Sequence, residues 1–123
     1  MPKRVLDVGN CSLDHGHISG MLSRNFSASV VQAHGLEDTL DLLRRGQFDL
    51  VLVNRKLDQD YSDGLDIIKE IKADADLAEI PCMLVTNYAE YQQQAVAAGA
   101  LLGFGKKELA DPDVLARLKP LLT

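Results

Sequence analysis

A chain of 123 residues is long enough to bury one hydrophobic core but has no room for two, so we expect a single domain over residues 1–123. Hydrophobic residues make up 46% of the chain and charged residues 25%, which excludes a disordered or fibrous protein. The formal net charge of -5 argues against nucleic-acid binding, because that function needs a basic face. The chain has no apolar run long enough to cross a membrane and no signal-peptide core, so we expect a cytoplasmic protein with Cys11 and Cys82 reduced.

Short apolar runs alternate with segments of helical periodicity along the chain. The runs have the length and aliphatic composition of buried strands, and they cover Val5 to Val8, Val30 to Ala33, Leu50 to Val53, Cys82 to Val85 and Leu101 to Phe104. Helices are expected over residues 14–26, 36–45, 64–72 and 90–99, and a fifth helix follows the last strand.

The predicted helices have apolar faces and recognisable ends. Leu36, Leu40 and Leu43 share one face of the second helix. Asp111 is suited to cap the last helix, because an acidic N-cap residue followed by proline at the first helical position favours a helix start. We expect Pro120 to end or kink that helix.

Five strands that are each followed by a helix predict an α/β fold of the (βα)5 type. Right-handed crossovers then place helices on both faces of a parallel sheet. Ligands of such sheets bind beyond the carboxyl ends of the strands. The residues at those ends are Gly9, Asn10, Asn54, Thr86 and Lys106, so we expect the functional site among them.

The stretch IPCMLVTNYAEYQQQAVAAGALLGFGKK, residues 80–107, resembles the fourth strand, fourth helix and fifth strand of the response-regulator receiver domain of two-component signalling. DGLDIIKEIK, residues 63–72, resembles the third helix of that family. The resemblance covers nearly the whole chain and implies a flavodoxin-like (CheY-like), doubly wound sheet with strand order 2-1-3-4-5. In the family, strand one ends in two acidic residues, strand three in the phosphoacceptor aspartate, strand four in Thr or Ser, and strand five in Lys. Thr86 and Lys106 match this pattern, whereas Gly9, Asn10 and Asn54 stand where the three carboxylates are expected.

The missing carboxylates change the chemistry that the resemblance implies. Mg²⁺ prefers anionic oxygen ligands, and the uncharged Asn54 amide cannot attack phosphorus as a carboxylate does. We therefore expect no catalytic residues, no bound Mg²⁺ or other cofactor, and no enzymatic activity. Taken singly, Asn54 also fits an ordinary turn residue, and Thr86 and Lys106 fit a strand-end hydroxyl and a solvated cation.

The predicted fifth strand departs from the family pattern as well. Gly103 stands at the switch position, where the family often has an aromatic residue. Phe104 lies one position further on, so the alternation of a strand turns it to the other face. Lys107 replaces the proline that usually follows the lysine of strand five, and the loop over residues 54–64 is longer than is usual in the family.

Two further features near the predicted site have an ordinary and a functional interpretation. Asp7 lies inside an apolar strand, so it needs a salt bridge or hydrogen bond, or else it lies beneath the pocket and partly replaces a lost acid. Cys11, His15 and His17 are close in sequence, but their spacing matches no standard zinc pattern. We therefore expect ordinary surface or partly buried residues there and no metal site.

Tyr88 and Tyr91 begin the predicted fourth helix, and together with Phe104 they indicate a partner-binding face. Single exposed tyrosines are also common on ordinary surfaces. We interpret the chain as a pseudo-receiver that acts in phosphorelay or two-component signal transduction through phosphorylation-independent protein–protein interaction. No nucleic-acid or membrane partner is expected. A homodimer through the fourth helix, fifth strand and fifth helix is one arrangement of this face.

The alternative is a domain that senses a small anion or another ligand in the altered pocket around Asn54, Thr86 and Lys106. With three carboxylates missing and Arg55 and Lys56 nearby, we expect a positive local potential. Lys106 then either holds an anion together with Thr86 or folds onto the side-chain oxygen of Asn54.

Overall fold

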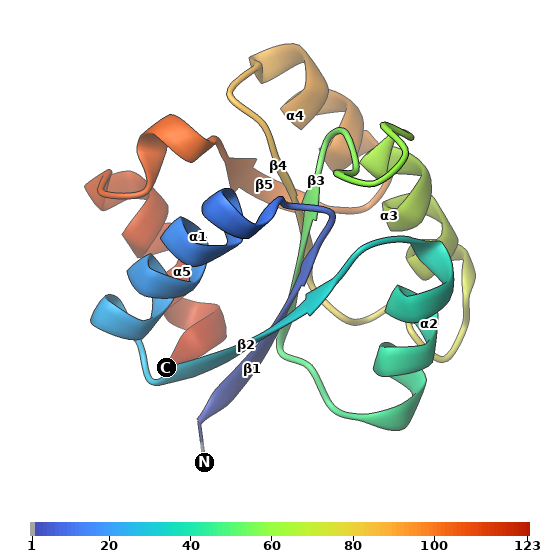
Figure 1. Cartoon of the computed structure of the whole chain (residues 1–123), viewed down its shortest axis with the longest axis horizontal. Coiled ribbons are helices and arrows are strands. Elements are labelled where there is room, and N and C mark those ends of the chain that lie inside the picture. Colours follow the sequence, from blue (N-terminus) through green and yellow to red (C-terminus); the bar gives the residue numbers. More distant parts are fainter. Residues whose placement is uncertain (1) are drawn as a thin grey trace.

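The computed structural model describes residues 2–123 and contains a five-stranded parallel sheet with helices on both faces (Figure 1). The strands are β1 (Lys3–Val8), β2 (Ala28–Ala33), β3 (Leu50–Asn54), β4 (Cys82–Val85) and β5 (Leu101–Phe104). The helices are α1 (Ser12–Asn25), α2 (Leu36–Arg45), α3 (Gly64–Ala73), α4 (Ala89–Ala97) and α5 (Pro112–Leu122), with a short 3-10 helix η1 (Lys106–Glu108). The order β2-β1-β3-β4-β5 confirms the doubly wound topology predicted from the sequence.

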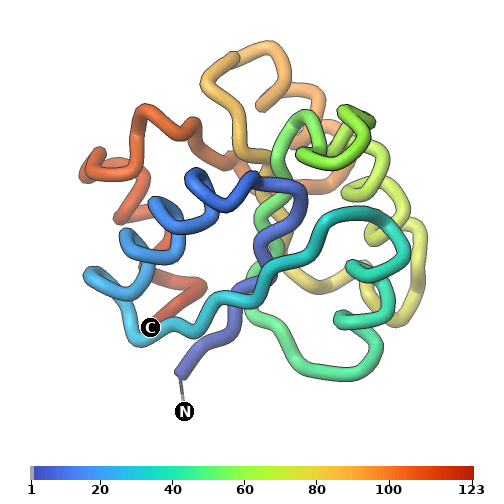
Figure 2. The backbone as a smooth tube through the Cα atoms, in the orientation of Figure 1, coloured from blue at the N-terminus to red at the C-terminus, as the bar shows by residue number. Residues whose placement is uncertain are grey.

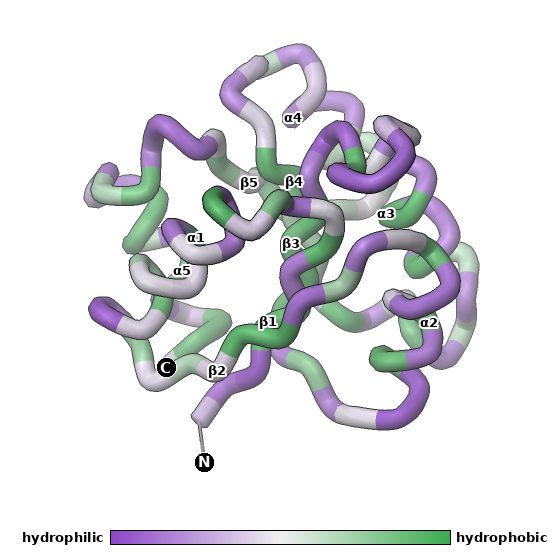
Figure 3. The backbone as a smooth tube through the Cα atoms, in the orientation of Figure 1, coloured by the Kyte–Doolittle hydropathy of each residue, from purple (hydrophilic) through white to green (hydrophobic). Residues whose placement is uncertain are grey.

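The sheet separates two apolar layers, because successive residues of each strand point to opposite faces. In β3, Leu50 and Leu52 pack with α1 and α5, whereas Val51 and Val53 pack on the side of α2 and α3. Figure 2 shows α1 and α5 side by side, and both helices contribute to the same apolar cluster. Hydrophobic residues are concentrated along the central strands in Figure 3, as expected for a sheet that is buried on both faces.

Most predicted boundaries agree with the structure to within two residues, and the differences have simple causes. β1 and β2 each begin two residues before the predicted start, because Lys3 and Arg4 of β1 pair with Ala28 and Ser29 of β2. Of the two effects expected of Pro120, an end of the helix is not observed, since α5 continues to Leu122. Leu122 is buried in the core, and this contact holds the last helical turn although proline supplies no N–H.

The apolar face predicted for α2 is only partly buried. Leu43 is buried, Leu40 is half-buried, and Leu36 in the first turn is exposed. No helix within residues 2–123 has both the length and the apolar character needed to cross a membrane.

Candidate functional site

The strand ends that the sequence singled out meet at one edge of the sheet. The side-chain nitrogen of Asn54 lies 3.2 Å from the carbonyl oxygen of Gly9, which joins the ends of β3 and β1. A cavity of about 220 Å³ opens beside them. It is lined by Asn54, Arg55, Lys56, Val85, Thr86, Asn87, Tyr88 and Lys106. The structure thus gathers Asn54, Thr86 and Lys106 around one hollow that has no carboxylate in its wall.

A side chain at Gly9 would be strained both by the backbone conformation and by a close neighbour. Its φ of +76° lies in the left-handed region, which residues other than glycine adopt at a cost. A Cβ atom there would also lie closer than 3.0 Å to the side chain of Leu57. Leu57 is buried, and the loop that carries it is tied to β1 by the amide of Asp58, which donates to Gly9 O at 2.9 Å. The loop after β3 therefore covers the place where an acidic side chain at position 9 would stand.

Asn54 uses its amide as a donor to the backbone. Its Nδ2 group donates to the carbonyl oxygens of Gly9 at 3.2 Å and Lys56 at 2.6 Å. A carboxylate could not make these bonds, because an ionised carboxylate only accepts hydrogen bonds. The amide of Asn54 thus compensates two carbonyl oxygens that converge on the same point.

Lys106 forms an ion pair with Asp14 of α1, with 2.7 Å between Nζ and Oδ2. In the structure Lys106 does not fold onto Asn54, as one alternative had it, but reaches Asp14; the other alternative, an anion held with Thr86, stays a prediction. The ammonium group of Lys106 holds the pKa of the Asp14 carboxyl below its ordinary value. Asp14 reduces the positive charge that we expected in this pocket, and it was not among the predicted site residues. An acidic residue in the first turn of the helix after β1 was the available sequence signal.

Asp7 is completely buried and is held by two neighbours. Its Oδ1 accepts a hydrogen bond from Asn10 at 2.5 Å, and its Oδ2 lies 2.6 Å from Nδ1 of His15 in α1. Burial raises the pKa of the Asp7 carboxyl, while the bonds from Asn10 and His15 oppose that rise. The expectation that Asp7 needs a partner is confirmed. Asn10, which is also fully buried, has a role at the site as the donor to this acid.

His15 is therefore occupied by Asp7, while Cys11 contacts Asp14 at 3.4 Å. Cys11 and Cys82 are both free thiols. Within residues 2–123, no three His, Cys, Asp or Glu side chains lie close enough together to hold a metal ion.

Gln92 joins α4 to the irregular pairing of β4 and β5. Its Nε2 donates to the carbonyl oxygens of Leu84 at 2.9 Å and Thr86 at 3.3 Å, and its Oε1 accepts from Gly103 N at 2.9 Å. The buried side-chain amide of Gln92 thus takes the place of direct backbone hydrogen bonds between β4 and β5 where the register of the two strands shifts. A Cβ atom at Gly103 would lie closer than 3.0 Å to the backbone oxygen of Leu84, so no side chain fits at this position.

The aromatic residues named for a partner face lie in three different environments. Tyr88 is 63% exposed and meets Tyr91 edge-to-face, with 6.0 Å between ring centroids. Tyr91 is half-buried beneath the guanidinium of Arg55, which lies 3.8 Å from the ring centroid. Phe104 is only 2% exposed and belongs to the core shared with α1 and α5. The prediction that Phe104 contributes to a partner face is therefore wrong, because the side chain that turns away from the switch position enters the core.

Comparison with known families gives a match to the response regulator receiver domain over residues 16–119. Over 123 residues the chain is 27% identical to the polar-differentiation response regulator DivK of Brucella anthropi, covering 99% of this chain and 98% of that protein.

Solved structures of response regulators have a similar fold. The signal receiver domain of a DNA binding response regulator from Colwellia psychrerythraea 34H gives a TM-score of 0.79 at 24% identity, covering 97% of both chains. The chemotaxis response regulator CheY4 of Vibrio cholerae gives a TM-score of 0.74 at 19% identity, covering 99% of this chain and 100% of that chain. These likenesses support the flavodoxin-like (CheY-like) fold.

Proposed function

Because this chain belongs to the response regulator receiver domain family, we propose that it acts in two-component-type signal transduction as a pseudo-receiver, through protein–protein contacts that do not depend on phosphorylation. Receiver domains are generally non-enzymatic signalling domains that contact partner proteins. The finer proposal concerns how this particular chain does so.

The bonding of Asn54 is the observation that carries the proposal. Phosphorylation of a receiver needs a carboxylate nucleophile at this strand end. Here the amide donates to the carbonyls of Gly9 and Lys56, so the side chain is committed to holding the backbone at the place where a nucleophile would act. Its nitrogen lone pair is delocalised and does not attack phosphorus.

The donor set around Asn54 is also a poor fit for Mg²⁺. That ion takes carboxylate oxygens and substrate phosphate. A side chain at position 9 would be strained and would press on Leu57, Asn10 is turned into the interior toward Asp7, and the nearby carboxylate of Asp14 is paired with Lys106. No step of the proposed function passes through a metal ion.

The bridge through Gln92 supports a domain with one fixed conformation. Switching in the family relies on an aromatic residue of strand five, and Gly103 cannot carry one without displacing the backbone of Leu84. Gln92 holds Thr86, Leu84 and Gly103 together from α4, so the two strand ends are tied rather than free to move. We propose that partners recognise this fixed surface, including Tyr88, and that a homodimer through α4, β5 and α5 is one such contact.

Intact-mass measurement tests the proposal directly. The protein is incubated with acetyl phosphate and Mg²⁺ beside a receiver that retains its three acids as positive control. We expect no stable phosphoryl adduct on this chain, and we expect capture of its protein partner from the native host to be the same with and without the donor. A phosphoryl group that maps to the pocket around Asn54 would contradict the proposal.

The alternative of an anion sensor in the pocket around Asn54, Thr86 and Lys106 receives less support. Asp14 already supplies the counter-charge of Lys106. If the pocket nevertheless serves an anion, sulfate should raise the melting temperature of the unchanged protein by mass action. We expect no such rise, and a rise only in an Asp14→Asn variant, in which Lys106 is released.

A further inference from the structure

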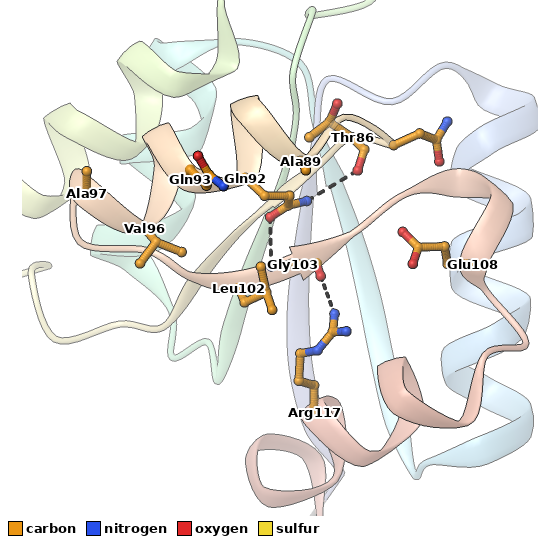
Figure 4. Close-up of a pocket in the computed structure, with 11 residues that line it drawn as sticks. Thr86, Ala89, Gln92, Gln93, Val96, Ala97, Leu102, Gly103, Glu108 and Arg117 are labelled. Carbon is orange, nitrogen blue, oxygen red and sulfur yellow. Dashed lines mark hydrogen bonds between the residues drawn. The ribbon is translucent and has the colours of Figure 1, made fainter.

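A second and larger hollow lies between α4 and α5 and adjoins the pocket around Asn54, with which it shares Thr86 and Asn87 (Figure 4). Its volume is about 720 Å³, which falls in the range of roughly 300–1,000 Å³ typical of small-molecule sites. One wall is the face of α4 that carries Ala89, Val96 and Ala97, and β5 forms the floor with Leu102 and Gly103. Arg117 of α5 reaches this floor from the opposite side.

The hollow is held open by bonds that do not depend on a ligand. Gly103 adds no side chain to the floor and tolerates none. Gln92, only 7% exposed, fixes the adjoining end of α4 through its three hydrogen bonds to the backbone of β4 and β5. A site built on such fixed contacts loses little entropy when a ligand binds, which favours binding.

Two apolar side chains at this hollow remain uncovered. Val96 is 46% exposed and Leu102 is 49% exposed, although both lie against the cavity. A ligand with an apolar body would remove part of this surface from water, and that transfer is favourable.

The polar group best placed to orient such a ligand is Arg117. Its Nη1 donates to the carbonyl oxygen of Gly103, and its other N–H groups make no hydrogen bond to the described residues. Within residues 2–123, no carboxylate forms an ion pair with it. Glu108, the acid that also lines the hollow, accepts a hydrogen bond from Gly105 N at 2.8 Å and is thereby engaged at the start of η1. A guanidinium with free donors recognises a carboxylate through paired hydrogen bonds.

From these contacts we propose that the hollow between α4 and α5 binds a free small carboxylic acid with an apolar body. The carboxylate pairs with Arg117, and the apolar body covers Val96 and Leu102. This hollow borders the pocket around Asn54 through Thr86 and Asn87 and lies on the α4, β5 and α5 face proposed for partners. Binding of an acid is measured independently of phosphorylation and of partner capture, so either proposal can fail without the other.

Phenylacetate is a suitable probe, and its binding can be followed by ¹H–¹⁵N spectra of the whole protein. Benzyl alcohol serves as the uncharged analogue, and an acetylated tripeptide ending in phenylalanine represents a carboxyl terminus of protein origin. We expect phenylacetate to bind with a Kd of about 1 mM, an affinity reasonable for a ligand of its size. The amide signals of Val96, Leu102 and Gly103 should move, and benzyl alcohol should bind about tenfold more weakly.

Matched variants separate the parts of the site. Arg117→Gln should weaken phenylacetate about tenfold, because a charged hydrogen bond is lost. Lys119→Gln removes the same charge from an exposed position of α5 outside the hollow and should leave the affinity unchanged. Ala97→Trp fills the hollow from an exposed helix position and should abolish binding while the melting temperature shows that the fold persists.

Several outcomes would overturn the assignment. One is that the amide signals of Val96, Leu102 and Gly103 do not move at a phenylacetate concentration of about 10 mM, which is ten times the expected Kd. Equal binding of benzyl alcohol, or equal loss of affinity in the Lys119 and Arg117 variants, would remove the carboxylate recognition. Much tighter binding of the tripeptide than of phenylacetate would assign the hollow to a peptide terminus instead of a free acid.

Discussion

Replacing Gly9 by aspartate, the residue type that the family has there, should destabilise the fold. The left-handed φ of +76° costs a residue with a side chain about 1 kcal/mol, with aspartate at the lower end. The new Cβ would press on Leu57, whose side chain must leave its preferred rotamer at about 1 kcal/mol or lose part of its burial. The Cα atom of Leu57 at 3.1 Å leaves little room for relief by a rotamer change alone. We expect a loss of about 2–3 kcal/mol in the free energy of unfolding.

Urea unfolding followed by circular dichroism measures this loss. For a chain of this size, it corresponds to a fall in melting temperature of about 6–12 °C. Gly16→Asp is the matched control, because it adds the same charge in α1 where a Cβ atom meets nothing within 4 Å. That control should stay within about 0.5 kcal/mol of the unchanged protein. If Gly9→Asp is as stable as Gly16→Asp, the argument that the loop after β3 has closed this position is refuted.

Three further predictions follow from the same part of the molecule. Asn10→Asp would bring a second carboxylate beside buried Asp7, so this variant should lower the free energy of unfolding by about 2 kcal/mol or more. Adding Asp7→Asn should restore much of the lost stability, and additive losses in a double-mutant cycle would contradict the repulsion between the two carboxylates. Asn54→Asp alone should gain no phosphoryl group when it is incubated with acetyl phosphate and Mg²⁺ and its intact mass is measured. The substitution turns a carboxylate toward two carbonyl oxygens and restores no metal site. A Mg²⁺-dependent adduct would show that another acid serves as a metal ligand. Because the pKa of Asp7 is raised in the folded protein, the stabilisation by Asp7 is complete below the ordinary carboxyl pKa of 3.8 and is lost as the pH rises through the folded-state pKa. The melting temperature of the unchanged protein minus that of Asp7→Asn should therefore fall with rising pH. A difference that grows with pH would contradict the direction of the pKa shift.

The fold was readable from the sequence because its signals are local. Runs such as Leu50 to Val53 have the length and aliphatic composition of strands buried on both faces, and Asp111 followed by proline marks the start of α5. The places where the prediction failed depend on distant contacts. Pro120 stays inside a helix because Leu122 reaches the core, and Leu36 is exposed because α2 meets the sheet mainly through its later residues.

The candidate site was predictable as a location but not as a bonding pattern. The topology rule placed Asn54, Thr86 and Lys106 at one edge, and the structure brings them to one cavity. The partners of these residues come from elsewhere in the chain and carry no local signal: Asp14 for Lys106 and Gln92 for Thr86. The buried glutamine of α4 and the acid in the first turn of α1 become informative only when the fold has placed β4, β5 and α1 beside one another.

The substitutions at the site depend on one another, and this interdependence is the physical reason to regard the site as remodelled rather than merely missing its acids. Asp7 excludes a second carboxylate at position 10, and Asn10 in turn satisfies Asp7 in the interior. Gly9 allows the loop carrying Leu57 to close over the end of β1, and this closure places Gly9 O where the Asn54 amide can donate to it. Restoring any one of the three acids therefore breaks a contact made by another residue. We therefore expect phosphorylation at this site to require several coupled changes, including the loop, whereas the interaction surface that we propose on the same fold needs none of them.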